Sequence, residues 1–133
     1  MNIAGTTAIL VVCYRKVNYA RLVLGNLLLN LTADRKIYVI DNNSGAEMIE
    51  MLDQVSAVAG GRMEILGCRK NIGKANAVNL LVREKRILDL HPAMVLMDQD
   101  IIFGAEDLNL LIRCLSDVAS PGAPTSKTTN RTA

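Results

Sequence analysis

Short apolar runs recur along this chain, and each of them ends in polar or charged residues. The first run, residues 8–13, reads AILVVC and is rich in β-branched side chains, as is typical of a strand buried in the centre of a sheet. Similar runs predict strands over residues 36–40, 62–66 and 94–97. The last of these is apolar throughout, which predicts a strand that is buried on both faces.

The segments between these runs carry apolar residues at helical spacing. The helix after the first strand is apolar on most sides, so we expect it to be deeply packed. The third predicted helix ends before Pro92, because the residue preceding a proline is disfavoured in helical geometry. The predicted helices cover residues 19–31, 44–59, 71–90 and 104–118.

Side chains that favour helix N-termini stand at the start of three of these helices. Asn18 is the candidate N-cap of the first, and Asn71 that of the third. Ser44 and Glu47 have the spacing of a capping box for the second.

Strands that alternate with helices at this spacing predict an α/β fold, a Rossmann-like parallel sheet of about four strands flanked by helices. The length of 133 residues fits one domain. We assign that domain to residues 1–119. Residues 120–133 are rich in Ser, Thr, Pro and Gly and are predicted to be a disordered tail.

Composition excludes some classes of function. A net charge of +2, with three tyrosines, one phenylalanine and no tryptophan, gives no basic, aromatic surface for nucleic acid. Three widely spaced cysteines favour free thiols in a reducing compartment. The N-terminus lacks the features of a signal peptide, and no apolar segment is long enough to span a bilayer. We therefore expect a cytoplasmic protein, peripheral to the inner face of the membrane if it binds there.

The most informative polar residues follow the fourth predicted strand. Side chains alternate along a strand, so Asp98 and Asp100 are expected to project to the same side, with Gln99 between them. Two adjacent carboxylates are ligands that Mg²⁺ or Mn²⁺ prefers and often shares with substrate phosphates. Solvated acids at the end of a strand are the plain alternative.

The other strands also end in polar residues, and in a parallel sheet all these ends lie at one edge, where ligands bind. Asp41 can accept hydrogen bonds from a base or a ribose, whereas Arg15, Arg69 and Lys74 can contact phosphates. The backbone N–H groups near Asn71 are expected to be free at a helix start. Each of these residues could instead have no ligand, and serve only to form a loop, to begin a helix or to keep the surface solvated.

The order of these motifs resembles the nucleotide-binding half of the family 2 glycosyltransferases, which have the fold called GT-A. The Asp-Gln-Asp form is most similar to the rhamnosyltransferase-like branch. Four segments carry the resemblance, residues 9–15 (ILVVCYR), 37–44 (IYVIDNNS), 69–79 (RKNIGKANAVN) and 95–100 (VLMDQD).

The resemblance implies a nucleotide-sugar donor, a divalent metal (Mg²⁺ or Mn²⁺) and a glycan or lipid acceptor, as in cell-wall or polysaccharide biosynthesis. Asp41 would contact the base or its ribose, and Asp98 would lie near the ribose and the metal. Asp100 would be a metal ligand. The Tyr14-Arg15 segment would border the base, and Arg69 and Asn71 would help to shape the pocket. Lys74 completes the candidate nucleotide-sugar-binding residues, on the residue pattern alone.

One departure from the family pattern concerns the part of the chain after Asp100. Family members continue with strands that build the acceptor site and carry a general base, whereas this chain soon ends. Glu106 and Asp107 suit a helix N-terminus, so the catalytic base stays unassigned. We therefore expect a truncated fold that binds donor without efficient transfer, and whose uncovered edge strand promotes self-association.

Other classes of function remain as alternatives. A non-catalytic interaction module with the same fold would not depend on Asp98 or Asp100. A phosphatase of the haloacid dehalogenase type is disfavoured, because its Asp-x-Asp normally lies on the first strand. A dinucleotide-binding domain is disfavoured because the loop after the first predicted strand has no glycine fingerprint.

Overall fold

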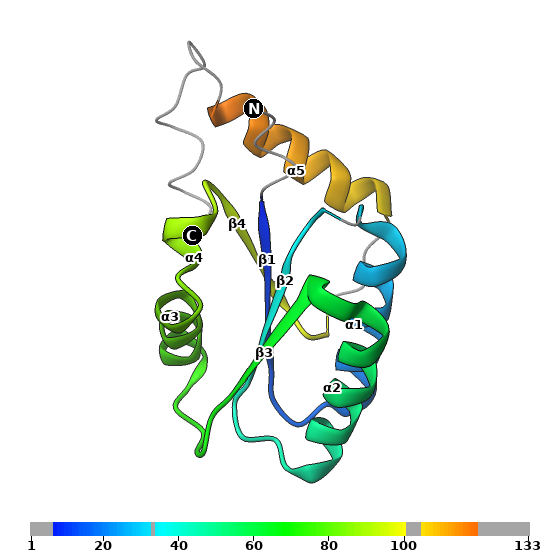
Figure 1. The fold of residues 1–133 in the computed structure, drawn as a ribbon, viewed down its shortest axis with the longest axis vertical. Helices are drawn as coiled ribbons and strands as arrows, with labels where there is room; N and C mark the ends of the chain where they lie inside the picture. The colour runs from blue at the N-terminus through cyan, green and yellow to red at the C-terminus, as the bar shows by residue number, and fades with distance from the viewer. Residues whose placement is uncertain (1–6, 33, 101–104, 120–133) are drawn as a thin grey trace.

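The computed structural model describes residues 7–32, 34–100 and 105–119, so the predicted tail lies outside the described residues. The chain forms a four-stranded sheet in the order β3-β2-β1-β4, with every neighbouring pair parallel. Helices cover both faces of the sheet (Figure 1). The predicted fold class is confirmed. The strands are β1 (Ala8–Cys13), β2 (Ile37–Asp41), β3 (Met63–Gly67) and β4 (Met94–Asp98).

β1 is one of the two inner strands of the described sheet, and all six of its residues are buried. Its register places Cys13 opposite Asp41 of β2 and Val12 opposite Asp98 of β4. The last residues of three strands therefore lie side by side. All four strands run the same way, so their carboxyl ends form one edge of the sheet, at the bottom of Figure 1.

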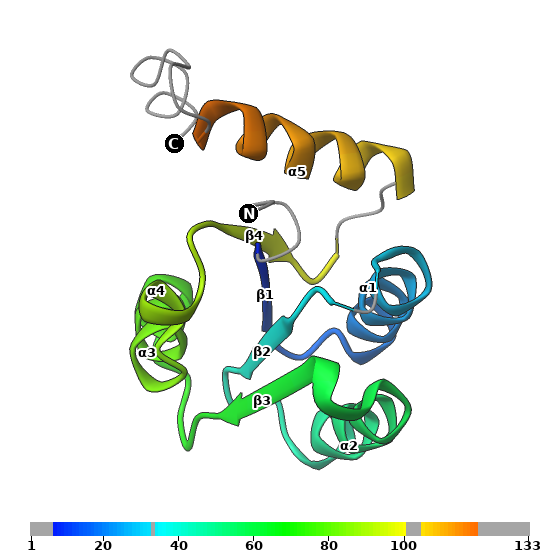
Figure 2. The same cartoon turned by 45° about the horizontal axis from the view of Figure 1, so that its top comes forward.

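The helices form two layers, one on each face of the sheet (Figure 2). One apolar cluster joins a face of the sheet to α1, α2 and α5, and the other joins the opposite face to α3 and α4. The helices are α1 (Val17–Asn30), α2 (Ala46–Ala59), α3 (Lys74–Glu84), α4 (Ile87–Leu90) and α5 (Ala105–Ala119), and a short 3-10 helix (Gly60–Arg62) follows α2.

The predicted N-caps of the first two helices are wrong, although the helices themselves are present. Lys16 is the N-cap of α1, and Asn18 instead accepts a hydrogen bond from Arg21. Gly45 is the N-cap of α2, with φ of 105°, a conformation that glycine adopts without strain. Neither cap makes a side-chain hydrogen bond, so backbone geometry determines where these helices begin.

The third predicted helix is also different from the prediction at its start and in its interior. Its N-cap is Gly73, with φ of 84°, rather than Asn71. The helix ends at Glu84, because Arg86 takes a left-handed conformation (φ of 54°) that separates α3 from α4. The long helix predicted over residues 71–90 is therefore two shorter ones.

The first helix is less deeply packed than its composition predicts. Only one stripe of α1 faces the sheet, and it buries Ala20, Val23, Leu24 and Leu27. Leu29, on the other side, is 85% exposed, and Leu22 is exposed as well. A helix on the surface layer of an α/β sheet has only one face to bury, whatever its composition.

β4 lies at an edge of the described sheet and is buried on one face only, which corrects the prediction of burial on both faces. Val95 and Met97 pack in the cluster that includes α5. Met94 and Leu96 point to the opposite face and are exposed, because α3 and α4 pack against β1 and β2 and do not extend over β4.

Two further observations concern the helices and the cysteines. Among the described residues, the helices are all too short or too polar to cross a bilayer. The three cysteines form no disulfide: Cys13 is buried, Cys68 is half-buried and Cys114 is exposed.

The packing of α1 gives a test of the fold with two leucines on one helix. Leu27 is fully buried, so Leu27→Ala should lower the free energy of unfolding by about 2–5 kcal/mol. Leu29→Ala, at an exposed position, should change it by less than about 0.5 kcal/mol. Urea unfolding followed by circular dichroism measures both. Equal losses would show that α1 packs in another orientation.

Candidate functional site

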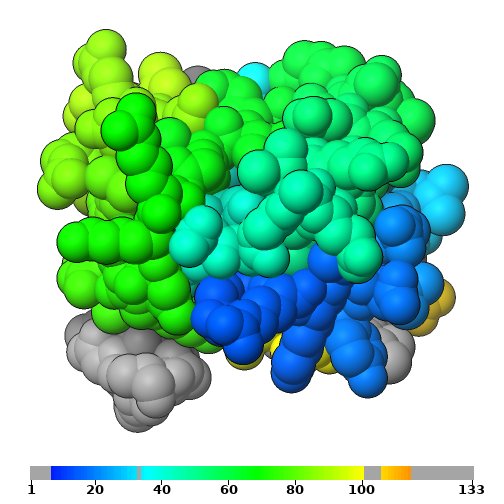
Figure 3. Space-filling view, turned by 90° about the horizontal axis from the view of Figure 1, so that it is seen from below, coloured from blue at the N-terminus to red at the C-terminus, as the bar shows by residue number. Residues whose placement is uncertain are grey.

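The polar segments that follow the strands meet at the carboxyl edge of the sheet. Figure 3 views this edge from below, with the blue segment after β1 lying beside the teal segment after β2. The end of β4, in yellow, is partly visible beneath the blue segment. Because the strands are parallel and in register, residues far apart in the sequence become neighbours here.

Asp98 and Asp100 line the same cavity, which has a volume of about 310 Å³. Asp98 is the last residue of β4, whereas Gln99 and Asp100 form a turn. The turn, rather than the alternation of a strand, therefore brings Asp100 to the cavity. The lining consists of Val12, Tyr14, Asn42, Lys74, Asp98, Gln99 and Asp100.

Gln99 fastens this acidic turn to the segment after β1. The Tyr14 N–H donates to Oε1 of Gln99 (2.9 Å), and Nε2 of Gln99 donates to the Tyr14 carbonyl (2.7 Å). The side-chain amide thus pairs with both polar groups of one backbone residue. This role of Gln99 could not be predicted from the sequence, because the two residues lie 85 positions apart and only the register of β1 and β4 brings them together.

Each of the two acids forms an ion pair with a lysine from a different segment. Lys74, the first residue of α3, pairs with Asp98. Lys16, from the segment after β1, pairs with Asp100 at 3.2 Å. Lys16 was not among the predicted site residues. No sequence pattern selects it, because lysines in loops are usually solvated.

Asn42 connects the segment after β2 to the segment before α3. It is only 3% exposed, and its Nδ2 donates to Oδ1 of Asn71 (2.8 Å). Its Oδ1 accepts the Ile72 N–H (2.9 Å), and Asn71 Oδ1 accepts the Gly73 N–H (2.9 Å). The N–H groups of Ile72 and Gly73, predicted to be free for a ligand, are therefore already bonded to protein. Asn71 organises this loop.

Asp41 lies beside a second cavity, of about 400 Å³, between the end of β3 and the start of α2. It is 4% exposed, and its Oδ1 accepts the Ser44 N–H (3.1 Å). Ser44 Oγ in turn accepts the Arg15 N–H (2.8 Å), which links the segments after β1 and β2. Ser44 therefore holds two loops together and does not cap α2. Gly67 and Cys68 complete this side of the cavity.

The two cysteines near Asp41 are held in the thiol form. Burial, reinforced by the negative charge of Asp41, raises the pKa of Cys13 to about 12. The same two causes raise the pKa of Cys68. Because the thiolate is the nucleophilic form, the raised pKa values disfavour the reactive state of both cysteines at neutral pH.

The two predicted arginines lie outside these cavities. Arg15 is exposed, has φ of 66°, and stacks its guanidinium 4.9 Å from the centre of the Tyr14 ring. Arg69 is exposed on the segment after β3 and lines neither of the two cavities. The structure thus brings Tyr14, Lys74, Asp98 and Asp100 together around one cavity, and places Asp41 at the other.

The oxygen ligands in the first cavity suit a hard divalent cation that is shared with a phosphate-bearing ligand. Among the described residues, no group of three or more acids, cysteines or histidines surrounds a single point. Asp98 and Asp100 provide two carboxylates at one cavity. Mg²⁺ sites often have only one or two protein carboxylates, the other ligands being water and substrate phosphates. The site therefore fits such a cation only together with a ligand that supplies oxygens.

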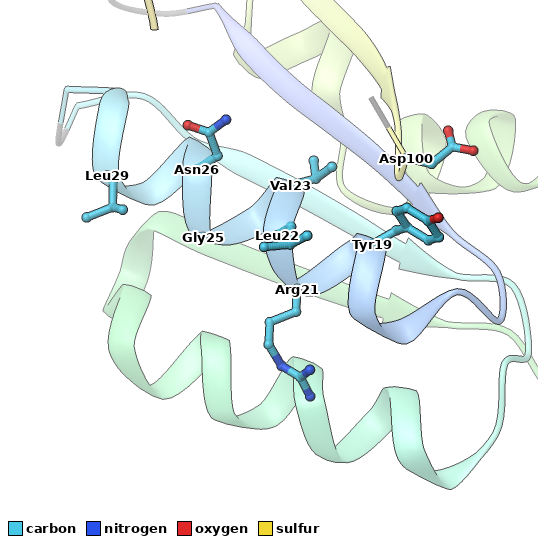
Figure 4. Close-up of a pocket in the computed structure, with 8 residues that line it drawn as sticks. All are labelled: Tyr19, Arg21, Leu22, Val23, Gly25, Asn26, Leu29 and Asp100. Carbon is cyan, nitrogen blue, oxygen red and sulfur yellow. The ribbon is translucent and has the colours of Figure 1, made fainter. Parts of the chain in front are cut away.

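Another cavity, of about 420 Å³, lies along the outer side of α1 (Figure 4). Its lining includes Tyr19, Leu22 and Leu29, and Asp100 stands at one end. Asp100 therefore borders this apolar groove as well as the polar cavity at the strand ends.

Comparisons with known proteins bear on the fold. No protein-family model matches this sequence, and no curated protein matches it. Among solved structures, the chain is similar to the mannosyltransferase PcManGT from Pyrobaculum calidifontis in complex with GDP-Man and Mn²⁺, with a TM-score of 0.70 at 18% identity. The match covers 87% of this chain and 33% of that one, so this chain spans a third of that enzyme's length.

The likeness shows that this chain has the Rossmann-like α/β fold found in a glycosyltransferase. The likeness concerns the fold, and not membership of the family 2 glycosyltransferases.

The contact between Gln99 and Tyr14 predicts a measurable local effect. Gln99→Ala removes both hydrogen bonds and should lower the free energy of unfolding by about 1–2 kcal/mol, with faster hydrogen exchange at the Tyr14 amide. Gln99→Glu keeps an oxygen that can accept the Tyr14 N–H. The Tyr14 amide should therefore exchange more slowly in this variant than in Gln99→Ala. NMR-detected exchange distinguishes the variants, and identical Tyr14 exchange in all three proteins would rule out the contact.

Proposed function

We propose that this chain is the donor-binding part of a glycosyltransferase, which holds a nucleotide-diphosphate sugar together with Mg²⁺ or Mn²⁺. The observation that carries the proposal is that Asp98, Asp100 and Lys74 line one cavity at the carboxyl edge of a parallel sheet. The mannosyltransferase that shares this fold binds GDP-Man and Mn²⁺. Membership of family 2, and of its rhamnosyltransferase-like branch, is part of the proposal and is supported by the four sequence motifs.

The two cavities suggest how the donor would divide between them. The diphosphate would lie in the cavity with Asp98 and Asp100, and the base or ribose would lie in the cavity with Asp41. A bound divalent cation would neutralise the charge of the leaving diphosphate as a Lewis acid. Tyr14 and Arg15 would border the nucleoside, because their segment lies between the two regions.

The remaining assigned residues support this arrangement from the loop before α3. Asn71 fixes the loop through Asn42. Arg69 is exposed beside that loop and could meet a donor phosphate only by moving its side chain. Transfer to a glycan or lipid acceptor, in the cytoplasm or at the inner face of the membrane, is proposed for the whole protein of which this fold is the donor-binding part. No residue described here is assigned as the catalytic base.

Calorimetry with GDP, UDP and dTDP and their sugars, each with and without Mn²⁺, tests this function. We expect Mn²⁺-dependent binding of one nucleotide, weakened about tenfold or more by Asp98→Asn or Asp100→Asn, because each variant loses an anionic metal ligand. Asp89→Asn is the matched control, since Asp89 is an exposed acid paired with Arg86 away from both cavities. Absence of binding by any of them at millimolar concentration would refute the proposal.

A second candidate function is a non-catalytic interaction module, and the exposed face of β4 favours it. Met94 and Leu96 are exposed on an edge strand, and such edges promote association of chains. This function predicts that Asp98→Ala and Asp100→Ala leave the behaviour of the protein unchanged.

Self-association through β4 is the corresponding prediction. Sedimentation velocity over a range of concentrations should show dimers of the unaltered chain. Leu96→Lys, which places a charge on the exposed face, should shift the distribution towards monomer by destabilising contact between two such edges. Leu29→Lys, which changes another exposed leucine but on α1, is the control. A monodisperse monomer at high concentration would exclude association through this edge.

A further inference from the structure

We propose that Lys16 and Lys74 are exchangeable counter-ions, which pair with Asp100 and Asp98 in the free protein and move to the diphosphate when a divalent cation binds. This inference rests on the proposed function. It adds a coupling between the two ligands, and it assigns a ligand-binding role to Lys16.

The geometry places one lysine on each acid, and the two lysines come from different segments of the chain. Lys16 comes from the segment after β1 and pairs with Asp100 at 3.2 Å. Lys74 comes from the start of α3 and pairs with Asp98. Both acids line the cavity, as does Lys74. The carboxylates that a cation would need are therefore already in contact with ammonium groups.

The charges of these four groups cancel. Two carboxylates and two ammonium groups sum to zero, so the arrangement attracts neither a lone cation nor a lone phosphate strongly. A cation and a diphosphate that arrive together replace each ion pair with a new one: the cation takes the carboxylates and the phosphates take the lysines. Because every charged group then has a new partner, no carboxylate or ammonium group is left unpaired.

The exchange requires only side chains to move. All four side chains are about half exposed, from 43% to 54%, so their ion pairs are screened by water and easily broken. Lysine carries its charge on a flexible four-carbon chain, which allows the ammonium group to change partner. The backbone of the turn stays in place, because the Gln99 amide is bonded to both polar groups of Tyr14.

Because the lysines and the cation compete for the same carboxylates, the cation and the nucleotide would bind cooperatively. The nucleotide removes the lysines from the carboxylates and should thereby raise the affinity for the cation. By thermodynamic reciprocity the cation raises the affinity for the nucleotide by the same factor.

The test measures Mn²⁺ binding from the electron paramagnetic resonance signal of free Mn²⁺, first with Mn²⁺ alone and then with GDP or UDP present. Lys16→Met and Lys74→Met should each bind Mn²⁺ alone about fivefold more tightly than the unaltered chain, since a competitor worth at most one exposed ion pair is gone. In these variants, addition of the nucleotide should tighten Mn²⁺ binding less than in the unaltered chain. Nucleotide binding without metal should be weaker.

Two further variants distinguish the effect of the lysine–carboxylate ion pairs on Mn²⁺ binding from the effect of net charge. Lys70→Met removes an exposed lysine from the segment before α3 and should leave Mn²⁺ binding unchanged. Lys74→Arg keeps the positive charge opposite Asp98 and should behave like the unaltered chain. Thermal unfolding of each variant verifies that it is folded before its binding is compared.

The outcomes for this inference and for the proposed function are separable. The inference is overturned if Lys16→Met and Lys74→Met bind Mn²⁺ no more tightly than Lys70→Met, even when the unaltered chain binds nucleotide with Mn²⁺. Failure of the proposed function is detected in the unaltered chain itself, as absence of nucleotide binding with Mn²⁺. In that case the coupling is overturned too, whatever the lysine variants do with Mn²⁺ alone.

Discussion

The parallel pairing of β1 with β2 on one side and β4 on the other is the constraint on which the candidate site depends. Cys13 faces Asp41 across one pair, and Val12 faces Asp98 across the other. The pairing fixes the level at which each strand ends. A shift of one residue in either register would turn the side chains of that strand to the opposite face and separate the polar segments. Burial of β1 on both faces makes such a shift costly.

The sequence was sufficient to predict the fold class and the approximate strands, because both follow from local patterns. An apolar run such as residues 8–13 is visible without knowledge of its neighbours. The errors arose where tertiary context decides. Gly45 and Gly73 begin helices through their backbone conformation, so the polar residues nearby were mistaken for caps. Whether Leu29 or Leu96 is covered depends on which helix lies above it, and composition does not contain that information.

In the candidate site, too, local sequence patterns could be interpreted and tertiary contacts could not. Asp98, Asp100 and Asp41 could be proposed from the sequence, because each lies at or just after the end of a predicted strand and a parallel sheet brings such ends to one edge. Gln99 and Asn42 could not, since an amide has no preferred partner until the fold supplies one. The structure also changed the meaning of residues that the sequence did identify. The loop before α3 was expected to offer free N–H groups, but its own side chains and Asn42 already satisfy those of Ile72 and Gly73.

The hydrogen bonds within and between these loops affect the entropy cost of binding a ligand at the carboxyl edge. Arg15 has a positive φ without being glycine, which costs roughly 1–2 kcal/mol. The contacts around Arg15 hold it in place: its N–H bonds Ser44, and the neighbouring Tyr14 is fastened to Gln99. Loops that hydrogen bonds already hold in place would lose little conformational entropy when a ligand binds. The groups left free to move are exposed side chains such as those of Lys16 and Lys74, and the proposed exchange of partners needs no change in the backbone around them.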